Sequence, residues 1–251
     1  MQRPRVTAFD LDGTLAESKQ RMSAEMGDLL GRLISHMPVA ILSGAGFAQF
    51  KKQVFPSLPP DTTLEHLFIF PVNAAQCLVY RDGDWKPQYD HSFTPAEKEE
   101  ILTELHSALV EVGLGEEPKE RWGERIEDRE AQISFSPLGQ QAPVEAKQRW
   151  AEAYNDKRRQ LHSILLKKLP NFAVAMGGMT TIDITRKGIT KAYGVRRLSE
   201  LTRIPIEEML YVGDALEEGG NDAVVLETGI PVHAVFGPHE TEAFIESIVQ
   251  S

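Results

Sequence analysis

The first third of the chain alternates apolar runs with a helical pattern. The runs that predict strands lack polar alternation and are VTAF at 6–9, PVAILS at 38–43 and HLFIFP at 66–71. Between the first two runs, residues 23–35 carry the pattern of a helix. Apolar strands separated by helices are typical of a parallel sheet that is covered on both faces. The opening of the chain is therefore predicted to be α/β.

The same rhythm returns after Gly188. The elements expected there are a helix at about 191–201, strands at 209–214 and 231–236, and a closing helix at about 239–249. Because these elements continue the pattern of the opening segment, both ends of the chain are expected to share one sheet. The predicted core is a Rossmann-like parallel α/β domain that is built from residues 1–83 and 187–251.

Residues 84–186 follow a different pattern. Thr94 and Glu97 have the spacing of a capping box, with Pro95 at the first helical position, and predict a helix that ends at Gly113. The other elements expected here are a strand at 132–136, a helix at about 144–169, and strands at 172–176 and 180–185. Strands with few helices between them indicate an antiparallel sheet backed by helices. The middle of the chain is therefore predicted to be an inserted α+β cap domain.

Polar side chains follow three of the predicted core strands. Asp10 follows VTAF, Ser43 ends PVAILS, and Asp214 follows MLYVG. Ligands of parallel α/β sheets bind beyond the carboxyl ends of the strands, so these residues are expected at one edge of the sheet. Asp12 lies two positions after Asp10 and faces the same way if the backbone stays extended. The sequence therefore predicts a group of carboxylates at that edge.

Such carboxylates repel one another and need a counter-charge. Oxygen ligands without a nearby histidine or cysteine pair favour Mg²⁺, which readily bridges to a phosphate. One aspartate of the pair can then act as an ionised nucleophile, while the other is protonated part of the time and acts as acid and base. Taken alone, an Asp-x-Asp pair fits a helix N-cap followed by a turn equally well.

Composition narrows the class of partner. The 251 residues are 41% hydrophobic and carry a formal net charge of -10, which argues against binding to nucleic acid or to an anionic membrane surface. A small anionic substrate remains open. The single cysteine, Cys77, lies in an apolar stretch and indicates a reducing compartment, so the cytoplasm is expected. The N-terminus lacks the apolar region of a signal peptide, and no apolar run approaches the ~20 residues that cross a bilayer.

The motifs FDLDGT, the serine that ends a strand, GITK and VGDALEEGGND occur in the order that resembles the haloacid dehalogenase superfamily of phosphotransferases. The resemblance implies that Asp10 attacks phosphorus and Asp12 protonates the leaving oxygen. It also implies that Ser43 and Lys191 hold the phosphoryl oxygens, although Lys187 is a nearby rival for the lysine role. The implied Mg²⁺ site comprises Asp10, Asp12 through its carbonyl, Asp214, Asn221 and Asp222.

A second resemblance lies in the insert. The segments RIEDREAQISFSPLG at 125–139 and AMGGMTTIDITRKGITK at 175–191 are similar to the eukaryotic phosphomannomutase family. That resemblance implies contacts with a phosphorylated hexose and a homodimer that forms through the insert. The substrate-binding positions that it implies are Lys19, Gly44, Arg129, Gln140, Lys147, Thr181 and Asp183.

Several of these positions depart from the family pattern. Gln140 stands where a second arginine is expected, Lys19 and Lys147 replace arginines, and Thr181 replaces a serine. Arginine binds phosphate with two parallel hydrogen bonds, whereas lysine is a point charge and glutamine adds no charge. A weaker grip on a second phosphate favours hydrolysis of an aspartyl phosphate over transfer back to a sugar.

The predicted function is therefore a Mg²⁺-dependent sugar-phosphate phosphatase, and a phosphomannomutase is the first alternative. A sensor that binds a sugar phosphate without turnover is a lower-ranked alternative. A dinucleotide site at SGAGFAQF is set aside, because Gln49 occupies the position of the third glycine.

Overall fold

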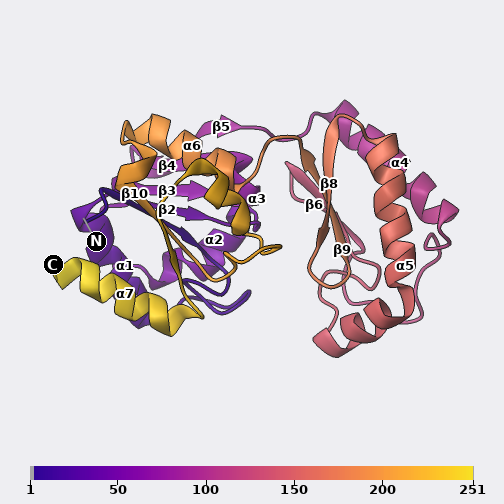
Figure 1. Ribbon diagram of the computed structural model, residues 1–251, viewed down its shortest axis with the longest axis horizontal. Coiled ribbons are helices and arrows are strands. Elements are labelled where there is room, and N and C mark those ends of the chain that lie inside the picture. Colours follow the sequence, from indigo (N-terminus) through magenta and orange to yellow (C-terminus); the bar gives the residue numbers. More distant parts are fainter. Residues whose placement is uncertain (1–2, 251) are drawn as a thin grey trace. The chain divides into compact units, whose positions relative to one another are not determined.

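The computed structural model describes residues 3–250, and these residues form two compact units (Figure 1). The larger unit combines the chain up to Asp90 with the chain from Ile189 onward. The smaller unit runs from His91 to Gly188. Within residues 3–250, no helix combines the length and the apolar composition that a membrane span requires.

The larger unit contains a seven-stranded sheet in the order β11-β10-β1-β2-β3-β4-β5. Its first five strands in that order are mutually parallel, and β4 and β5 are added as antiparallel strands. The strands are β1 (Val6–Asp10), β2 (Val39–Leu42), β3 (Leu67–Phe70), β4 (Gln76–Arg81), β5 (Asp84–Asp90), β10 (Met209–Gly213) and β11 (Val232–Ala234). The central strand β1 is buried along its whole length, as its apolar sequence predicts.

Helices cover both faces of this sheet (Figure 1). The helices are α1 (Ala24–His36), α2 (Phe47–Gln53), α3 (Pro71–Ala74), α6 (Lys191–Thr202) and α7 (Pro238–Gln250). Short 3₁₀ turns occupy Phe55–Ser57, Leu64–His66, Ile206–Glu208 and Ala223–Thr228. Phe9 of β1 packs in one core with residues of α1, α2 and α7, whereas Ala8 packs in another with residues of α6. This alternation along β1 explains why the strand is apolar at every position before Asp10 except Thr7.

The smaller unit packs two helices against a four-stranded antiparallel sheet in the order β6-β7-β9-β8. Its elements are α4 (Pro95–Glu111), β6 (Ile126–Asp128), β7 (Gln132–Phe135), α5 (Val144–Lys168), β8 (Phe172–Gly177) and β9 (Thr181–Arg186). The capping box of α4 forms as predicted, because Thr94 accepts from the backbone of Glu97 and Glu97 accepts from the backbone of Thr94. The predicted fold class, a parallel α/β core with an α+β insert, matches this architecture.

The insert begins later than the sequence pattern suggests. Strand β5, expected in the insert, pairs with β4 and forms the edge of the larger sheet. The turn at Asp82 and Gly83, where both residues have positive φ, returns the chain onto β4. Trp85 then stacks on Phe55 of the larger unit with ring centroids 4.7 Å apart, so it belongs to this unit rather than to the insert.

Gly194 fixes how closely α6 approaches the sheet. A Cβ atom at this position would lie 2.6 Å from the Ala74 side chain and 2.7 Å from the Leu42 side chain. In a helix, alanine is more favourable than glycine by about 1 kcal/mol. Replacing Gly194 with alanine would therefore stabilise the protein if the space around this position were open. At this contact, overpacking should reverse the sign.

We therefore expect Gly194→Ala to lower the free energy of unfolding by about 1–3 kcal/mol, because α6 must move away from the sheet. Urea denaturation measures the change. Arg196→Ala, an exposed change on the same helix, is the control and should alter stability by less than about 0.5 kcal/mol. A Gly194→Ala protein as stable as the unsubstituted chain would contradict the packing argument.

Candidate active site

Three polar residues lie at the carboxyl ends of adjacent parallel strands. Asp10 is the last residue of β1, Ser43 follows β2, and Asp214 follows β10. Strand β1 pairs with both β2 and β10, in register from Thr7 to Phe9. The three positions therefore come to one edge of the sheet, as the sequence pattern predicted.

A cluster of carboxylates forms at this edge. Asp10, Asp214 and Asp222 each offer a carboxylate oxygen, and these oxygens lie within 4.8 Å of one another. Asp222 enters the cluster through a loop, in which its backbone N–H donates to the Ala215 carbonyl at 3.0 Å. Asp10 and Asp222 are buried, at 2% and 0% exposure, whereas Asp214 is partly exposed. Their mutual repulsion requires positive charge nearby.

Lys191 supplies that charge from the first position of α6. Its Nζ donates to Asp10 Oδ1 at 2.5 Å and to Asp222 Oδ1 at 2.6 Å, and the side chain is 1% exposed. The hydroxyl of the buried Tyr211 also donates to Asp222 Oδ1, at 2.6 Å. One ammonium faces three carboxylates, so the cluster keeps an excess of negative charge when all of them are ionised.

Burial and charge shift the titration of this cluster. Burial raises the pKa of Asp10 from 3.8 to about 7, Lys191 opposes the shift, and Asp222 adds to it. Burial also raises the pKa of Asp214. For Lys191, burial opposes the ammonium, but Asp10 and Asp222 outweigh it and raise the pKa. Lys191 therefore stays charged, and Asp10 changes its charge near neutral pH.

One oxygen of Asp10 is available for chemistry. Asp10 Oδ2 is buried and has no hydrogen-bond partner within residues 3–250. A buried carboxylate oxygen without a donor is costly unless a cation or a ligand meets it. The donor set around it consists of carboxylate oxygens, which is the set that Mg²⁺ prefers. The residues present therefore fit a magnesium ion.

Gly13 permits the close approach of the Asp10 turn to Asp214. Its φ is +88°, and a Cβ atom there would lie 2.4 Å from Asp214 Oδ2. The next residue, Thr14, donates its hydroxyl to Asp214 Oδ1 at 3.2 Å. The glycine and threonine of FDLDGT thus position Asp214 as well as the turn itself.

Asp12 has a different environment from Asp10. Its carboxylate is not among those that group with Asp10 and Asp214. Instead, Asp12 Oδ1 accepts from the backbone N–H of Lys19 at 2.6 Å and from Gln53 Nε2 at 3.2 Å. The exposed Lys19 itself has a left-handed backbone, with a φ of 60°. The two aspartates of the motif are therefore held by separate sets of partners.

The loops after β2 and β3 meet beside Ser43. Ser43 is 2% exposed, and its Oγ accepts from the Ala45 N–H at 3.0 Å. Its carbonyl accepts from the N–H of Asn73 at 2.8 Å. A Cβ atom on Gly44 would lie 3.5 Å from the Asn73 side chain. Ser43 and Gly44 thus lie against Asn73, which the sequence pattern did not single out.

The segment that carries Asn73 is strained. Val72, Asn73 and Ala74 have φ values of 52°, 53° and 68°, although none is a glycine. A left-handed conformation is unusual for a β-branched residue such as Val72, and such strain concentrates at functional sites. Asn73 tolerates this conformation better than most residues, but PVNA lacks the glycine that would have marked the turn clearly in the sequence.

Two predicted positions are more exposed than their near neighbours in the cluster. Asn221 is exposed, whereas its neighbour Asp222 is buried and contacts Lys191. Lys187, the rival of Lys191, is exposed in the smaller unit. In both pairs of near neighbours, Asn221 with Asp222 and Lys187 with Lys191, the second residue is buried and the first is exposed.

The predicted substrate-binding residues of the smaller unit already have partners within it. Arg129 donates to Glu127 Oε2 at 2.9 and 2.6 Å. The amide of Gln140 donates to the Ser134 carbonyl at 3.2 Å, and the Ser134 hydroxyl donates to Asp183 Oδ1 at 2.6 Å. Much of the charge and hydrogen-bonding capacity on this sheet is thus balanced locally.

The other two predicted positions lie at the start of β9 and in α5. Thr181 donates its hydroxyl to the Gly177 carbonyl at 2.5 Å, across the turn between β8 and β9. Lys147 lies near the start of α5 and is partly exposed.

Arg158 organises the turn between β8 and β9 and was not predicted from the sequence. Its guanidinium donates to the carbonyls of Gly177, Gly178, Met179 and Thr181, at distances from 2.8 to 3.3 Å. Arg158 is 7% exposed. The buried guanidinium therefore stabilises the conformation of the turn that precedes and includes Thr181.

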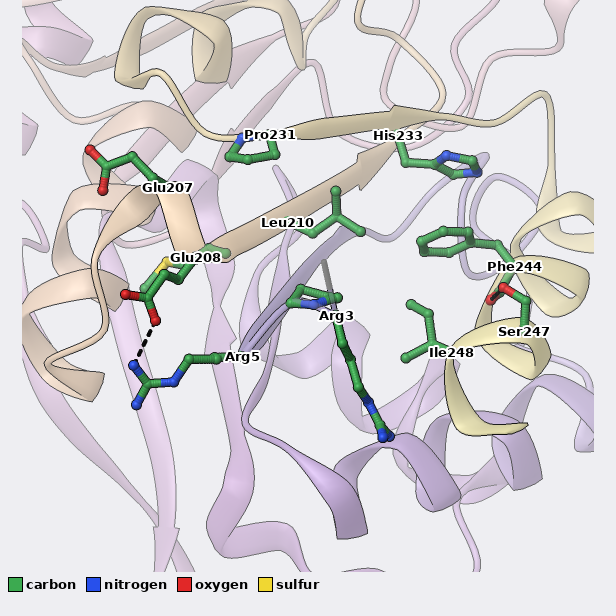
Figure 2. Close-up of a pocket in the computed structure, with 12 residues that line it drawn as sticks. Arg3, Arg5, Glu207, Glu208, Leu210, Pro231, His233, Phe244, Ser247 and Ile248 are labelled. Carbon is green, nitrogen blue, oxygen red and sulfur yellow. Dashed lines mark hydrogen bonds and ion pairs between the residues drawn. The ribbon is translucent and has the colours of Figure 1, made fainter. Parts of the chain in front are cut away.

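A separate cavity of about 530 Å³ lies in the larger unit (Figure 2). It is lined by residues at the amino ends of β1 and β10, including Arg5, Met209 and Leu210, and by Phe244 and Ile248 of α7. Figure 2 shows Arg5 paired with Glu208 there. Arg5 Nη1 lies 2.6 Å from Glu208 Oε2. The carboxylate cluster lies at the opposite ends of the same strands, so this cavity is not part of it.

Comparison with known proteins identifies the lineage of the chain. The family model described as eukaryotic phosphomannomutase matches residues 26–251. A phosphomannomutase of Triticum aestivum is 26% identical over 249 residues, covering 97% of this chain and 94% of that protein. A phosphomannomutase of Spinacia oleracea is 27% identical over 242 residues, covering 94% and 92% respectively.

Solved structures support the fold. IMP-bound, N-terminally truncated IMP-nucleotidase of Plasmodium falciparum superposes with a TM-score of 0.68 at 17% identity, covering 99% of this chain and 68% of that one. Trehalose-6-phosphate phosphatase of Aspergillus fumigatus superposes with a TM-score of 0.62 at 15% identity, covering 99% and 94%. These likenesses confirm the predicted fold class.

We expect Lys191→Met to lower the free energy of unfolding by about 3–5 kcal/mol at pH 8, because Asp10 and Asp222 lose their buried counter-charge. The loss should be smaller at pH 6, where a proton on Asp10 replaces part of that charge. Denaturant titrations at both pH values measure it. The matched control is Lys187→Met, at an exposed position, which should change stability by less than about 0.5 kcal/mol. Equal effects of the two substitutions would contradict this view of the cluster.

Proposed function

The chain belongs to the eukaryotic phosphomannomutase family, and on this premise we propose that it transfers the phosphoryl group of a hexose phosphate to Asp10 and then chiefly to water. It is an enzyme of the haloacid dehalogenase type that includes phosphatases and phosphohexomutases. The observation that carries the proposal is the buried Asp10, with one oxygen held by Lys191 and the other without a donor in the described chain.

A magnesium ion fits the proposal. Asp10, Asp214 and the backbone carbonyl of Asp12 would hold it, with Asp222 and Asn221 in or beside the same shell. When bound, Mg²⁺ neutralises charge on the carboxylates and on the phosphoryl oxygens. Asp222 is already engaged through Oδ1 by Lys191 and Tyr211, which favours a supporting position for it.

In the first step, Asp10 Oδ2 attacks phosphorus while the bond between phosphorus and the sugar oxygen breaks. Lys191 holds Oδ1 and keeps Asp10 oriented, and Ser43 donates to a phosphoryl oxygen. Asp12 gives its proton to the leaving sugar oxygen. The products of this step are the sugar with a free hydroxyl group and a phosphoryl group bound to Asp10.

In the second step, Asp12 accepts a proton from a water molecule as that water attacks phosphorus. The bond between phosphorus and Asp10 breaks, inorganic phosphate is released, and both aspartates regain their starting protonation. Because the pKa of Asp10 is about 7 before Mg²⁺ binds, the nucleophile is fully ionised only when a cation or a higher pH favours its charged form.

Hydrolysis is proposed as the main outcome because the smaller unit offers a weak grip on a second phosphate. The guanidinium of Arg129 is neutralised by Glu127, and Gln140 carries no charge. A mutase must retain a hexose bisphosphate while the sugar turns over, and each lost charge-assisted hydrogen bond weakens that retention by roughly 1.5–3 kcal/mol.

Phosphomannomutase activity is the second candidate, and the family match over residues 26–251 favours it. In both cases Asp10 takes a phosphoryl group from a sugar oxygen. For a phosphatase the donor is a hexose monophosphate and the final acceptor is water, whereas for a mutase the donor is a hexose bisphosphate and the final acceptor is a hydroxyl of a hexose monophosphate.

We expect Mg²⁺ to raise the melting temperature by several degrees at pH 8 and by less at pH 6. The folded pKa of Asp10 is about 7 against 3.8 ordinarily, so the metal-free fold loses stability as the pH rises between these values. Mg²⁺ binds the ionised form and restores the loss, by about 2.7 kcal/mol at a hundredfold excess over its dissociation constant.

Differential scanning fluorimetry with and without Mg²⁺ measures this shift. Asp10→Asn should remove most of it, whereas Asp28→Asn, at an exposed position, should leave it intact. A shift that is unaffected by Asp10→Asn would place the ion elsewhere.

Given mannose 1-phosphate and a catalytic amount of hexose 1,6-bisphosphate, the protein should release phosphate faster than it forms mannose 6-phosphate. Gln140→Arg should raise the ratio of isomerisation to hydrolysis about tenfold, because it adds one charged donor for a second phosphate. Coupled assays of both products measure the ratio, and Gln141→Arg at the adjacent exposed position is the control. Isomerisation that far outpaces phosphate release in the unsubstituted protein would instead favour the mutase.

A further inference from the structure

Gln53 is a buried amide directed at Asp12. It is the last residue of α2 and is 1% exposed. Its Nε2 donates to Asp12 Oδ1 at 3.2 Å and to the Gln20 carbonyl at 2.8 Å. Both neighbours are acceptors, so the orientation of the amide is fixed, with Nε2 toward Asp12. The backbone carbonyl of Gln53 also accepts from the Met22 N–H at 2.9 Å. The segment from Gln20 to Met22 is thus hydrogen-bonded to the end of α2 at two points.

The two oxygens of Asp12 are therefore unequal. Oδ1 accepts from Gln53 and from the backbone N–H of Lys19, whereas no donor within residues 3–250 reaches Oδ2. A proton on Oδ1 would face two donors and disrupt both hydrogen bonds. The proton of Asp12 is thus confined to Oδ2.

We propose that Gln53 is a positioning residue that fixes Asp12 so that Oδ2 exchanges the proton with the leaving oxygen and with water. This role rests on the proposed function, in which Asp12 is the acid and base. In this role Gln53 acts through its contact with Asp12 Oδ1, while Oδ2 exchanges the proton. Its burial and its second hydrogen bond to Gln20 keep the amide from turning away.

The isosteric variant Gln53→Met tests this role, because it removes the amide and keeps the length of the side chain. With a hexose phosphate, kcat should fall at least tenfold while KM stays within about twofold, since substrate binding is unaffected. With p-nitrophenyl phosphate, whose leaving group needs no proton, the initial burst of nitrophenolate should remain and the slower steady-state rate should fall. Gln49→Met, on the same helix at a partly exposed position, should change neither rate.

A double-mutant cycle separates positioning from a general structural effect. In an Asp12→Asn background, Gln53→Met should change the remaining activity by less than twofold, because the group on which Gln53 acts is already gone. A further loss in that background, or a burst that falls with the steady-state rate, would overturn the proposal. If Gln53→Met does not fold, Gln53→Asn keeps an amide that is too short to reach Asp12 and should give the same split.

Different results contradict the proposed function and the role of Gln53. An unsubstituted protein that releases no phosphate and shows no burst would contradict the proposed function, and the role of Gln53 would fall with it. An active protein in which Gln53→Met retains full kcat would contradict the role of Gln53 alone.

Discussion

A single buried ammonium allows the charged centre of the larger unit to exist. Lys191 lies between Asp10 and Asp222, and all three side chains are almost completely withdrawn from solvent. Two carboxylates at that depth would take up protons without a cation between them. Gly194 lets α6, which begins at Lys191, approach the sheet, and the pairing of β1 with β10 brings Asp10 close to Asp214. The order of the strands and the packing of α6 therefore both determine whether Lys191 can balance the charge of the buried carboxylates.

The polar positions at or just after strand ends could be predicted, because the place where an apolar run stops is visible in the sequence. Asp10, Ser43 and Asp214 belong to this group. Contacts made across the chain could not be predicted in this way. Lys191 and Asp10 are 181 positions apart, and nothing in the local pattern indicates that Tyr211 reaches Asp222.

Other features escaped prediction because their physical cause is local geometry rather than composition. The left-handed turn at Val72–Ala74 contains no glycine, so the sequence does not mark it clearly as a turn. Strand β5 reads as the start of the insert, because its sequence alternates polar residues as an exposed edge strand does. Gln53 resembles any glutamine at the end of a helix until the fold brings Asp12 to it.

The two aspartates of the opening motif divide the chemistry through their surroundings. Asp10 is buried beside an ammonium and keeps one oxygen without a donor, which suits a nucleophile. Asp12 is more exposed and has one oxygen bound by two N–H donors, which suits a group that gives and takes a proton at the other oxygen. Both roles are set within the larger unit and are the same for a phosphatase and for a mutase. Under the proposed function, the final acceptor depends on how strongly the smaller unit retains a second phosphate, and there Glu127 pairs with Arg129 and Gln140 brings no charge. Membership of a mutase family and an outcome dominated by hydrolysis are therefore physically compatible.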